Sequence, residues 1–518
     1  MADWSKKFDS NRIGVANNAR LTPDRPAFIV GKNKVSFAQM DRAIISLAKV
    51  LTYLGMKPGD HIAALFHNTH EHYMLWAAAG LLKVTSLVIN YNLKKSELAY
   101  ILDDSQCKLL MYDYDFEDVV KEMNKELTHV NPIRVCSGAP KNVDKIHLEN
   151  LMEKAAASEL QIYTQSGVVP PTLTYTSGTT GRPKGVFRSG ANRRDYLFLL
   201  AHTFGCGHDD VHIIAGPLYH SAPFAFGAMS FLLGNTIIIM PKFNAEEFLH
   251  LVSERNITTT FMVPTMMHRI LNLPENTRNK YNISSLRSIV IAGEPFPFSM
   301  KKRCVEYFGD GKVFEFYGGT ELGIATFIPP EDQLRKPGSC GKAIVDEIDI
   351  KILDDEMNEV PVGEVGILYI NSPYLLEGYH NNPEATAANF HNGYFTVGDM
   401  GYVDQDGYYY IVDRAVDMII SGGVNIYPAE IEEVLYRHID IRAAAVIGAP
   451  DPQWGEKIIA YVVLKNNSEM DAEQIIKYVG DNLATYKKPK EVIFVDELPT
   501  SATGKVLKRE VKQIYLSC

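Results

Sequence analysis

The chain has 518 residues, of which 46% are hydrophobic and 22% are charged, and its formal net charge is −10. This length predicts several packed units, and the excess of acidic side chains argues against nucleic acid as the main partner. The six cysteines form no Cys-x-x-Cys pair, the start lacks a signal peptide, and no apolar run reaches the length of a membrane span. We therefore expect a cytoplasmic protein with reduced thiols and no integral membrane segment.

Helical and strand-like patterns alternate from the start of the chain to about Ala343. Apolar residues recur at helical spacing in 37–55 and in 71–82, and the short apolar run between them, 61–66, is typical of a buried strand. The runs "IIIMP" and "SIVIAG" continue this alternation farther along the chain. The pattern predicts the α/β fold class, with buried and largely parallel strands.

The pattern changes near Ile344, where short strand-and-turn pieces predict a small β-rich subdomain. The last part of the chain again alternates helix and strand, as expected of a compact unit. We predict a large N-terminal domain of α/β sheet subdomains, with the β-rich subdomain at its end, at 1–413. A hinge at 414–417 and a small mobile α+β C-terminal domain at 418–518 complete this division.

The stretch "TSGTTGRPKG", residues 176–185, follows the mostly apolar "PPTLTY". Its glycines, hydroxyls and two cations suit a polyphosphate, because a flexible backbone can turn its amide donors toward an anion. It is not the P-loop of kinases, since Lys184 is followed by Gly185, and no dinucleotide-binding glycine fingerprint opens a helix in this chain. An ordinary solvated surface loop is the alternative interpretation.

Three further motifs follow this loop in order. They are "FEFYGGTELG" at 314–323, the segment 395–432 with "GDMGY" and "SGGVNIYPAEIE", and "LPTSATGKVLKREV" near the C-terminus. Together the four motifs resemble the AMP-forming acyl-adenylate (ANL) superfamily, which includes acyl-CoA synthetases, luciferases and peptide-synthetase adenylation domains. The resemblance extends from about Leu21 to Lys508.

The resemblance implies the two-step reaction of an acid–thiol ligase. A carboxylic acid and ATP would form acyl-AMP and pyrophosphate, and the thiol of coenzyme A would then attack the acyl group and release AMP. The implied cofactors and substrates are ATP, magnesium (Mg2+) and coenzyme A, and a homodimer is left open. Two alternatives remain: a ligase that loads a carrier-protein thiol, and a non-catalytic nucleotide-binding relative, which the intact Glu321 and Lys505 disfavour.

The resemblance also implies a set of phosphate contacts. Glu321 has the family position of the magnesium ligand, where a hard carboxylate oxygen suits a hard cation. Thr320 is expected to contact the α-phosphate. The residues expected to contact the β- and γ-phosphates are Thr176, Ser177, Gly178, Thr179, Thr180, Gly181 and Lys184.

The adenosine contacts follow from the same motifs. Asp399 matches the residue that accepts hydrogen bonds from both ribose hydroxyls, and Arg414 matches its partner. The residues expected around the adenine are Tyr317 and Gly318 on one side and Gly293, Glu294 and Pro295 on the other.

The C-terminal motifs imply the groups that act in turn on the acyl group. Lys505 matches the catalytic lysine, whose ammonium would neutralise charge between the carboxylate and the α-phosphate. The residues Ser421, Gly422 and Gly423 resemble the segment along which the pantetheine thiol approaches.

Two residues at the boundary depart from the family pattern. Val416 stands at the pivot of the predicted hinge, where a polar residue is usual, and Asp413 replaces the usual glycine before Arg414. We still expect adenylation despite both departures, whereas the domain rotation becomes a less direct expectation.

The segment "GPLYHSAPFAFGAMSFLLG" is expected to face the acyl group. His220 matches the position that faces the acyl carboxyl, and Ala222, Ala225 and Gly318 are expected to line the pocket. No carboxylate stands in this segment, so the ammonium of an amino acid would be buried without a partner. We therefore predict an apolar substrate, either a medium- or long-chain fatty acid or an alicyclic acid.

Overall fold

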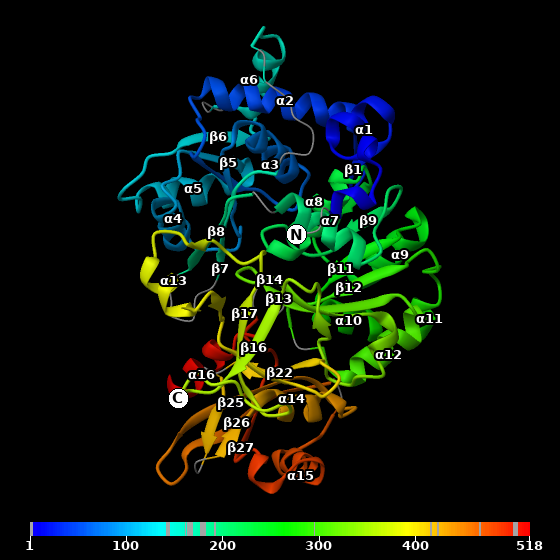
Figure 1. Ribbon diagram of the computed structural model, residues 1–518, viewed down its shortest axis with the longest axis vertical. Helices are drawn as coiled ribbons and strands as arrows, with labels where there is room; N and C mark the ends of the chain where they lie inside the picture. Colours follow the sequence, from blue (N-terminus) through cyan, green and yellow to red (C-terminus); the bar gives the residue numbers. More distant parts are fainter. Residues whose placement is uncertain are drawn as a thin grey trace.

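The structure is a computed structural model that describes residues 4–140, 146–160, 162, 169–176, 183–190, 193–294, 296–414, 417–421, 424–465, 468–500 and 506–517. In these residues the strands form four sheets. Two large sheets make up the N-terminal part of the molecule, and the C-terminal segment, orange to red in Figure 1, lies at the opposite end.

The larger sheet has nine strands among the described residues, and its central strands are parallel. In spatial order they are β15 (Lys342–Ala343), β14 (Gly323–Ile328), β13 (Val313–Gly319), β12 (Ser288–Ile291), β11 (Thr259–Met262), β9 (Val211–Ile214), β10 (Thr236–Ile239), β1 (Pro26–Val30) and β2 (Asn33–Ser36).

The second sheet has seven described strands, with a parallel centre and an antiparallel edge. In spatial order they are β18 (Gly378–Tyr379), β8 (Lys184–Arg188), β7 (Thr172–Thr176), β4 (Thr85–Val88), β3 (His61–Leu65), β5 (Leu109–Asp113) and β6 (Ile133–Ser137).

Helices between these two sheets share one hydrophobic core with both. The core contains Ile62 and Met111 of the seven-stranded sheet as well as Ile213 and Ile237 of the nine-stranded sheet. The helices that contribute to it include α2 (Phe37–Tyr53), α3 (Glu71–Leu82), α7 (Arg193–Thr203) and α8 (Ser221–Leu232). Almost every side chain of α8 is buried, which agrees with its apolar sequence.

Nine further helices belong to this part of the described chain. They are α1 (Val15–Leu21), α4 (Lys95–Asp104), α5 (Glu117–Asn124), α6 (Leu148–Ala156), α9 (Ala245–Arg255), α10 (Pro264–Leu271), α11 (Glu275–Arg278), α12 (Phe298–Phe308) and α13 (Pro383–Asn389). Several of them, such as α9, α10 and α12, add buried residues to the same core.

A smaller antiparallel sheet follows, as the strand-and-turn pattern predicts. Its described strands are β16 (Asp349–Leu353), β17 (Gly366–Asn371), β19 (Phe390–His391), β20 (Tyr394–Phe395), β21 (Asp399–Val403) and β22 (Tyr409–Arg414).

The C-terminal segment contains a sheet and three helices among its described residues. They are β23 (Ile419–Ser421), β24 (Val424–Ile426), β25 (Ile441–Asp451), β26 (Gly455–Leu464), β27 (Glu491–Phe494), α14 (Pro428–Arg437), α15 (Ala472–Asn482) and α16 (Lys508–Ser517). The predicted α/β class, with a large N-terminal part and a smaller C-terminal one, is confirmed.

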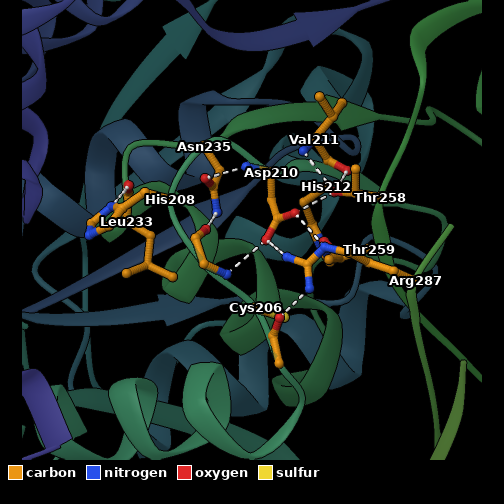
Figure 2. A network of polar contacts seen from close by, with 12 residues as sticks. Cys206, His208, Asp210, Val211, His212, Leu233, Asn235, Thr258, Thr259 and Arg287 are labelled. Carbon is orange, nitrogen blue, oxygen red and sulfur yellow. Dashed lines mark hydrogen bonds and ion pairs between the residues drawn. The ribbon is translucent and has the colours of Figure 1, made fainter. Parts of the chain in front are cut away.

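A polar network closes the amino ends of β9, β11 and β12 (Figure 2). The carboxylate of Asp210 accepts hydrogen bonds from the amide of Gly207 at 2.8 Å, from Thr258 Oγ1 at 2.7 Å and from Arg287 Nε at 3.2 Å. The amide of Asp210 donates to Asn235 Oδ1 at 3.0 Å. Each of these buried polar groups therefore has a partner inside the protein.

Candidate active site

A tight hairpin lies at the carboxyl end of β13, the edge of a parallel sheet where ligands bind in α/β proteins. Gly319 pairs with Gly323, so the turn between β13 and β14 consists of residues 320–322. A Cβ on Gly318 would lie 2.1 Å from the carbonyl oxygen of Gly323, a distance that no side chain tolerates. Gly323 itself has φ of +72°, a conformation that favours glycine. The glycines thus fix the place of Thr320 and Glu321.

Three elements distant in sequence contact this turn. Glu321 Oε1 accepts a hydrogen bond from Thr176 Oγ1, at the end of β7, at 3.1 Å. The hydroxyl of Tyr379, on β18, lies 3.4 Å from the same oxygen. Ser221 Oγ, at the start of α8, lies 3.1 Å from Thr320 Oγ1. The structure therefore brings the "YGGTE" motif to the beginning of the phosphate loop.

The two ends of the predicted phosphate loop, residues 176–185, lie side by side. Thr176 pairs with Lys184 across the antiparallel β7–β8 ladder. The ammonium of Lys184 lies 5.0 Å from the centre of the Tyr379 ring, whose hydroxyl points to Glu321. Residues 177–182 between these ends lie outside the described part of the chain, and they include the predicted Ser177, Gly178, Thr179, Thr180 and Gly181.

The predicted ribose residues form a second polar group. Asp399 and Arg414 stand opposite each other in the β21–β22 ladder, and Arg414 Nε donates to Asp399 Oδ1 at 3.1 Å. The hydroxyl of Tyr317, on β13, donates to Asp399 Oδ2 at 2.7 Å. Burial, followed by the charge and hydrogen bond of Asp399, raises the pKa of Tyr317 well above its usual value. Tyr317 therefore stays a hydrogen-bond donor at neutral pH.

Gly293 and Glu294 follow the carboxyl end of β12. Gly293 has φ of +95°, which favours glycine at this bend. Burial raises the pKa of Tyr436 on α14, and the charges of Glu432 and Glu294 add to this rise. A helix of the C-terminal segment thus lies close to the predicted adenine wall. Pro295 is outside the described residues.

His220 precedes α8 and follows the carboxyl end of β9. Burial lowers its pKa to about 4, so the imidazole is neutral at neutral pH. Its Nε2 atom is buried and has no hydrogen-bond partner among the residues that the structure describes. This nitrogen therefore retains its capacity for one hydrogen bond, as do other buried atoms of the described residues such as His72 Nδ1 and His268 Nε2.

A small cavity of about 80 Å³ adjoins the Thr320 turn. Two of the predicted acyl-pocket residues, Ala222 and Ala225 of α8, line it, and Gly319 rather than Gly318 contributes from the hairpin. Its other lining residues are Thr174, Val186, Arg188, Gly190, Tyr196, Ser221, Thr320, Pro373, Tyr374, Leu375 and Glu377.

The sequence analysis did not identify Arg188 in this cavity. The alternation of side chains along β8 contains a signal, because Lys184, Val186 and Arg188 must share one face of the strand. The partners of Arg188, however, lie far away in the sequence.

The C-terminal motifs are described in part. Ser421 ends β23 and lies opposite Gly455 of β26. The other residues predicted in this segment lie outside the described part of the chain, namely Val416, Gly422, Gly423 and Lys505.

Asp413 connects β22 to the C-terminal segment. Its Oδ2 accepts a hydrogen bond from the amide of Ala429, in the first turn of α14, at 3.1 Å. The ammonium of Lys508 lies 4.0 Å from the same oxygen and 3.0 Å from Glu432 Oε1. The residue that replaces the family's glycine thus contacts helices on the far side of the predicted hinge.

The oxygen atoms of Glu321 and Thr176 suit a magnesium ion that is bound together with a nucleotide. Within the described residues no group of three or more histidine, cysteine or acidic side chains could hold a metal ion. A single carboxylate, Glu321, with the hydroxyl of Thr176 beside it, suits magnesium, because this ion keeps several waters and binds through one or two carboxylates and substrate phosphates.

Comparisons with known proteins agree with these motifs. The sequence profile of the AMP-binding enzyme family matches residues 15–380, and that of the AMP-binding enzyme C-terminal domain matches residues 430–505. The chain is 32% identical to 2-succinylbenzoate–CoA ligase of Bacillus cereus (strain ATCC 10987 / NRS 248) over 498 residues, which are 96% of this chain and 97% of the relative. It is 34% identical to the long-chain-fatty-acid–CoA ligase FadD13 of Mycobacterium tuberculosis over 504 residues, again 96% and 97% of the two chains.

The o-succinylbenzoate CoA synthetase of Bacillus subtilis is similar in structure. Its complex with the acyl-adenylate OSB-AMP superimposes with a TM-score of 0.81 at 32% identity, over 99% of this chain and 98% of that one. The same enzyme in complex with ATP and a magnesium ion gives a TM-score of 0.81 at 31% identity, over 99% of both chains. The predicted requirement for ATP, magnesium and coenzyme A is thus confirmed at the level of the family. The chain belongs to the AMP-binding enzyme family, and it is an AMP-forming acid–thiol ligase of the acyl-CoA synthetase type.

Proposed function

We propose that the protein activates an apolar carboxylic acid, either a medium- or long-chain fatty acid or an alicyclic acid, as its CoA thioester. The observation that supports this proposal most is the meeting of Thr176, Thr320 and Glu321 beside a cavity lined by Ala222 and Ala225. The hairpin that we propose to bind phosphate adjoins these two alanines there, and Arg188 and Glu377 also line the same cavity. One relative is named for a long-chain fatty acid and another for an aromatic acid.

In the first step a carboxylate oxygen attacks the α-phosphorus of ATP, the bond to the β-phosphate breaks, and pyrophosphate leaves. Thr320 would hold the α-phosphate, and Thr176 and Lys184 would hold the outer phosphates at the two ends of their loop. Glu321 would bind magnesium, which neutralises phosphate charge when it is bound. Lys505 would stabilise the charge that grows between the two reacting groups.

In the second step the thiol of coenzyme A attacks the acyl carbon, the bond to AMP breaks, and the thiol proton is released. Asp399, Arg414 and Tyr317 would keep the adenosine in place through both steps. The segment of Ser421, Gly422 and Gly423 would guide the thiol after the domain 418–518 rotates about 414–417. Lys505 and the thiol of coenzyme A cannot both contact the acyl group at once. The proposal therefore requires the C-terminal domain to rotate between the two steps.

A neutral His220 suits the carboxyl group of the proposed acid. In the tautomer with a proton on Nε2, it can donate one hydrogen bond to the acyl carboxylate without adding a charge. Among the described residues no helix is long and apolar enough to cross a membrane. We further propose that the enzyme works in the cytoplasm.

The test is a panel of fatty, alicyclic, aromatic and amino acids, assayed for pyrophosphate release with and without coenzyme A. We expect release with the fatty or alicyclic acids, and a thioester product when coenzyme A is present. Acyl-AMP that accumulates with coenzyme A but reacts with a carrier protein would identify a carrier-protein ligase instead. No release with any acid, together with tight ATP binding, would identify a non-catalytic relative.

A further inference from the structure

We propose that Arg188 is a positioning residue for adenylation, which holds the Thr320–Glu321 turn in the orientation that the triphosphate requires. The inference rests on the proposed function, because it assumes that Thr320 contacts the α-phosphate and that Glu321 binds magnesium. Arg188 ends β8, the strand that begins with Lys184 after the phosphate loop.

The guanidinium of Arg188 connects two segments of backbone. Its Nε and Nη2 atoms donate to the carbonyl oxygen of Thr320 at 3.2 and 2.7 Å, and its Nη1 atom donates to the carbonyl oxygen of Tyr374 at 2.5 Å. The amide of Leu376 in turn donates to the carbonyl oxygen of Glu321 at 2.8 Å. Both carbonyl groups of the predicted phosphate- and metal-binding pair are therefore fixed from the same side.

Two donors of Arg188 restrain the carbonyl group of Thr320. The Nε and Nη2 donors of one planar guanidinium converge on the single carbonyl oxygen of Thr320, so they hold it more firmly than one donor would. This restraint limits the movement of the Thr320 backbone, while the side-chain rotation still sets the direction of Oγ1. Ser221 Oγ then needs to adjust only the side-chain rotation of Thr320, at 3.1 Å.

The surroundings of the Arg188 charge differ from those of a typical buried arginine. The described hydrogen bonds of Arg188 go to carbonyl oxygens, and the carboxylates of Glu321 and Glu377 interact with its charge electrostatically over a longer distance. Burial lowers its pKa, yet a guanidinium stays protonated in proteins. Its positive charge thus remains beside the site where the proposed substrate has its most negative group.

Strand β18 connects the contacts of Arg188 with the surroundings of the Glu321 carboxylate. Gly378 and Tyr379 pair with Phe187 and Val186 of β8, so the segment that supplies the carbonyl of Tyr374 also supplies the Tyr379 hydroxyl near Glu321. Moving Arg188 would therefore disturb the segment that supplies the Tyr379 hydroxyl to the Glu321 carboxylate. An arginine that merely filled the cavity would have no such connection.

The test compares Arg188→Leu and Arg188→Lys with Arg287→Leu as a matched control. Arg287 also donates to a backbone carbonyl, that of Gly205, but it lies in the Asp210 network at the amino ends of the strands. Two half-reactions are measured separately in each purified full-length variant: ATP–pyrophosphate exchange, and thioester formation from preformed acyl-AMP and coenzyme A. Melting temperature and the magnesium dependence of exchange are recorded for the same samples.

For Arg188→Leu we expect kcat of the exchange reaction to fall about a hundredfold, since displacements near 1 Å have effects of this size. The magnesium concentration at half-maximal rate should rise, KM for ATP should change by less than about threefold, and the thioester step should retain most of its rate. Arg188→Lys should recover part of the exchange rate but not the normal magnesium dependence, because an ammonium lacks the planar pair of donors that converges on the Thr320 carbonyl oxygen and the third donor to Tyr374. Arg287→Leu should lower the melting temperature and leave the ratio of the two half-reactions unchanged.

Unchanged exchange kinetics in Arg188→Leu would overturn the inference. So would equal losses in both half-reactions with a normal magnesium dependence, since that result describes a structural role like that of Arg287. Failure of the proposed function has a different signature, because the wild-type protein would then give no exchange with the fatty and alicyclic acids of the panel.

Discussion

Asp210 and His220, at opposite edges of the nine-stranded sheet, differ in how their polar atoms are paired. At the amino ends of its strands, Asp210 is satisfied by Gly207, Thr258 and Arg287, all from within the protein (Figure 2). At the carboxyl ends, a buried nitrogen of His220 has no partner among the described residues.

Glu321 shows the same contrast with Asp210. Its carboxylate accepts only neutral hydroxyl donors among the contacts that the structure describes, from Thr176 and Tyr379. A closed network stabilises the fold, whereas incompletely paired groups leave bonding capacity for a substrate. Changes at the carboxyl edge should therefore alter catalysis more than stability, and changes at the amino edge should do the reverse.

The largest effect is expected from Glu321→Gln. Losing the anionic oxygen should lower the rate of adenylation about a hundredfold to a thousandfold and raise the magnesium requirement. The melting temperature should stay near that of the wild type, because an amide oxygen can still accept from Thr176. The measurement is pyrophosphate exchange across a magnesium titration, with the exposed Glu331→Gln as control. A normal magnesium dependence would remove Glu321 from the proposed metal site.

Ala225→Asp tests the carboxyl edge of the sheet at the cavity beside Thr320. A carboxylate there would lose water as an apolar acyl chain enters, so exchange with fatty or alicyclic acids should fall by about tenfold to a hundredfold. Ala225→Asn is the matched control, since it has nearly the same size and no charge. If both variants lose the same activity, the volume of the pocket matters rather than its polarity. Full activity of Ala225→Asp would show that this face of α8 does not contact the acyl chain.

Asp210→Asn probes the opposite edge. An amide cannot accept from all three donors and cannot pair with the charge of Arg287, so the free energy of unfolding should fall by about 2 kcal/mol. Urea unfolding gives this loss, and the exchange rate per folded molecule should stay within about twofold of the wild type. A large loss of exchange in fully folded Asp210→Asn protein would contradict the division between the two edges.

The smallest effect concerns pH and His212, which accepts or donates a hydrogen bond with Thr259 Oγ1 at 3.0 Å. Burial lowers the pKa of His212 to about 4, whereas an unfolded histidine titrates near 6.5. Between these values the unfolded chain binds the extra proton, so the stabilisation present above pH 6.5 is lost as the pH falls toward 4. The slope contributed by one histidine is at most about 1.4 kcal/mol per pH unit.

His212→Asn should therefore make the decline of the melting temperature between pH 7 and pH 5 shallower. His72 and His268, whose pKa values burial also lowers to about 4, should still contribute their shares. An identical decline in the variant and the wild type would mean that His212 does not control this range of pH.

Local patterns in the sequence were sufficient for much of the fold. The apolar spacing of 71–82 matches the bounds of α3, and the run at 61–66 contains β3, because each pattern reflects a period that the element itself imposes. The change of pattern near Ile344 likewise corresponds to the smaller antiparallel sheet.

The site was predictable only where a motif contained it. The resemblance pointed to Thr176 and Glu321, and the structure shows their side chains in contact. Arg188 could not be found in this way, since its acceptors are 132 and 186 residues away in the chain. The same limit applies to Asp413, whose sequence context identifies a departure from the family but not its contact with Ala429.

The crowded hairpin at Gly318 sets a rule for redesigning this enzyme. With the Gly323 carbonyl 2.1 Å from the missing Cβ, position 318 cannot be included in a library of variants without dislocating the turn. Ala222 and Ala225 line the cavity from another element, α8, so substitutions there do not meet the Gly323 carbonyl. Under the proposed function, these two positions are the ones at which variants should change the range of acids.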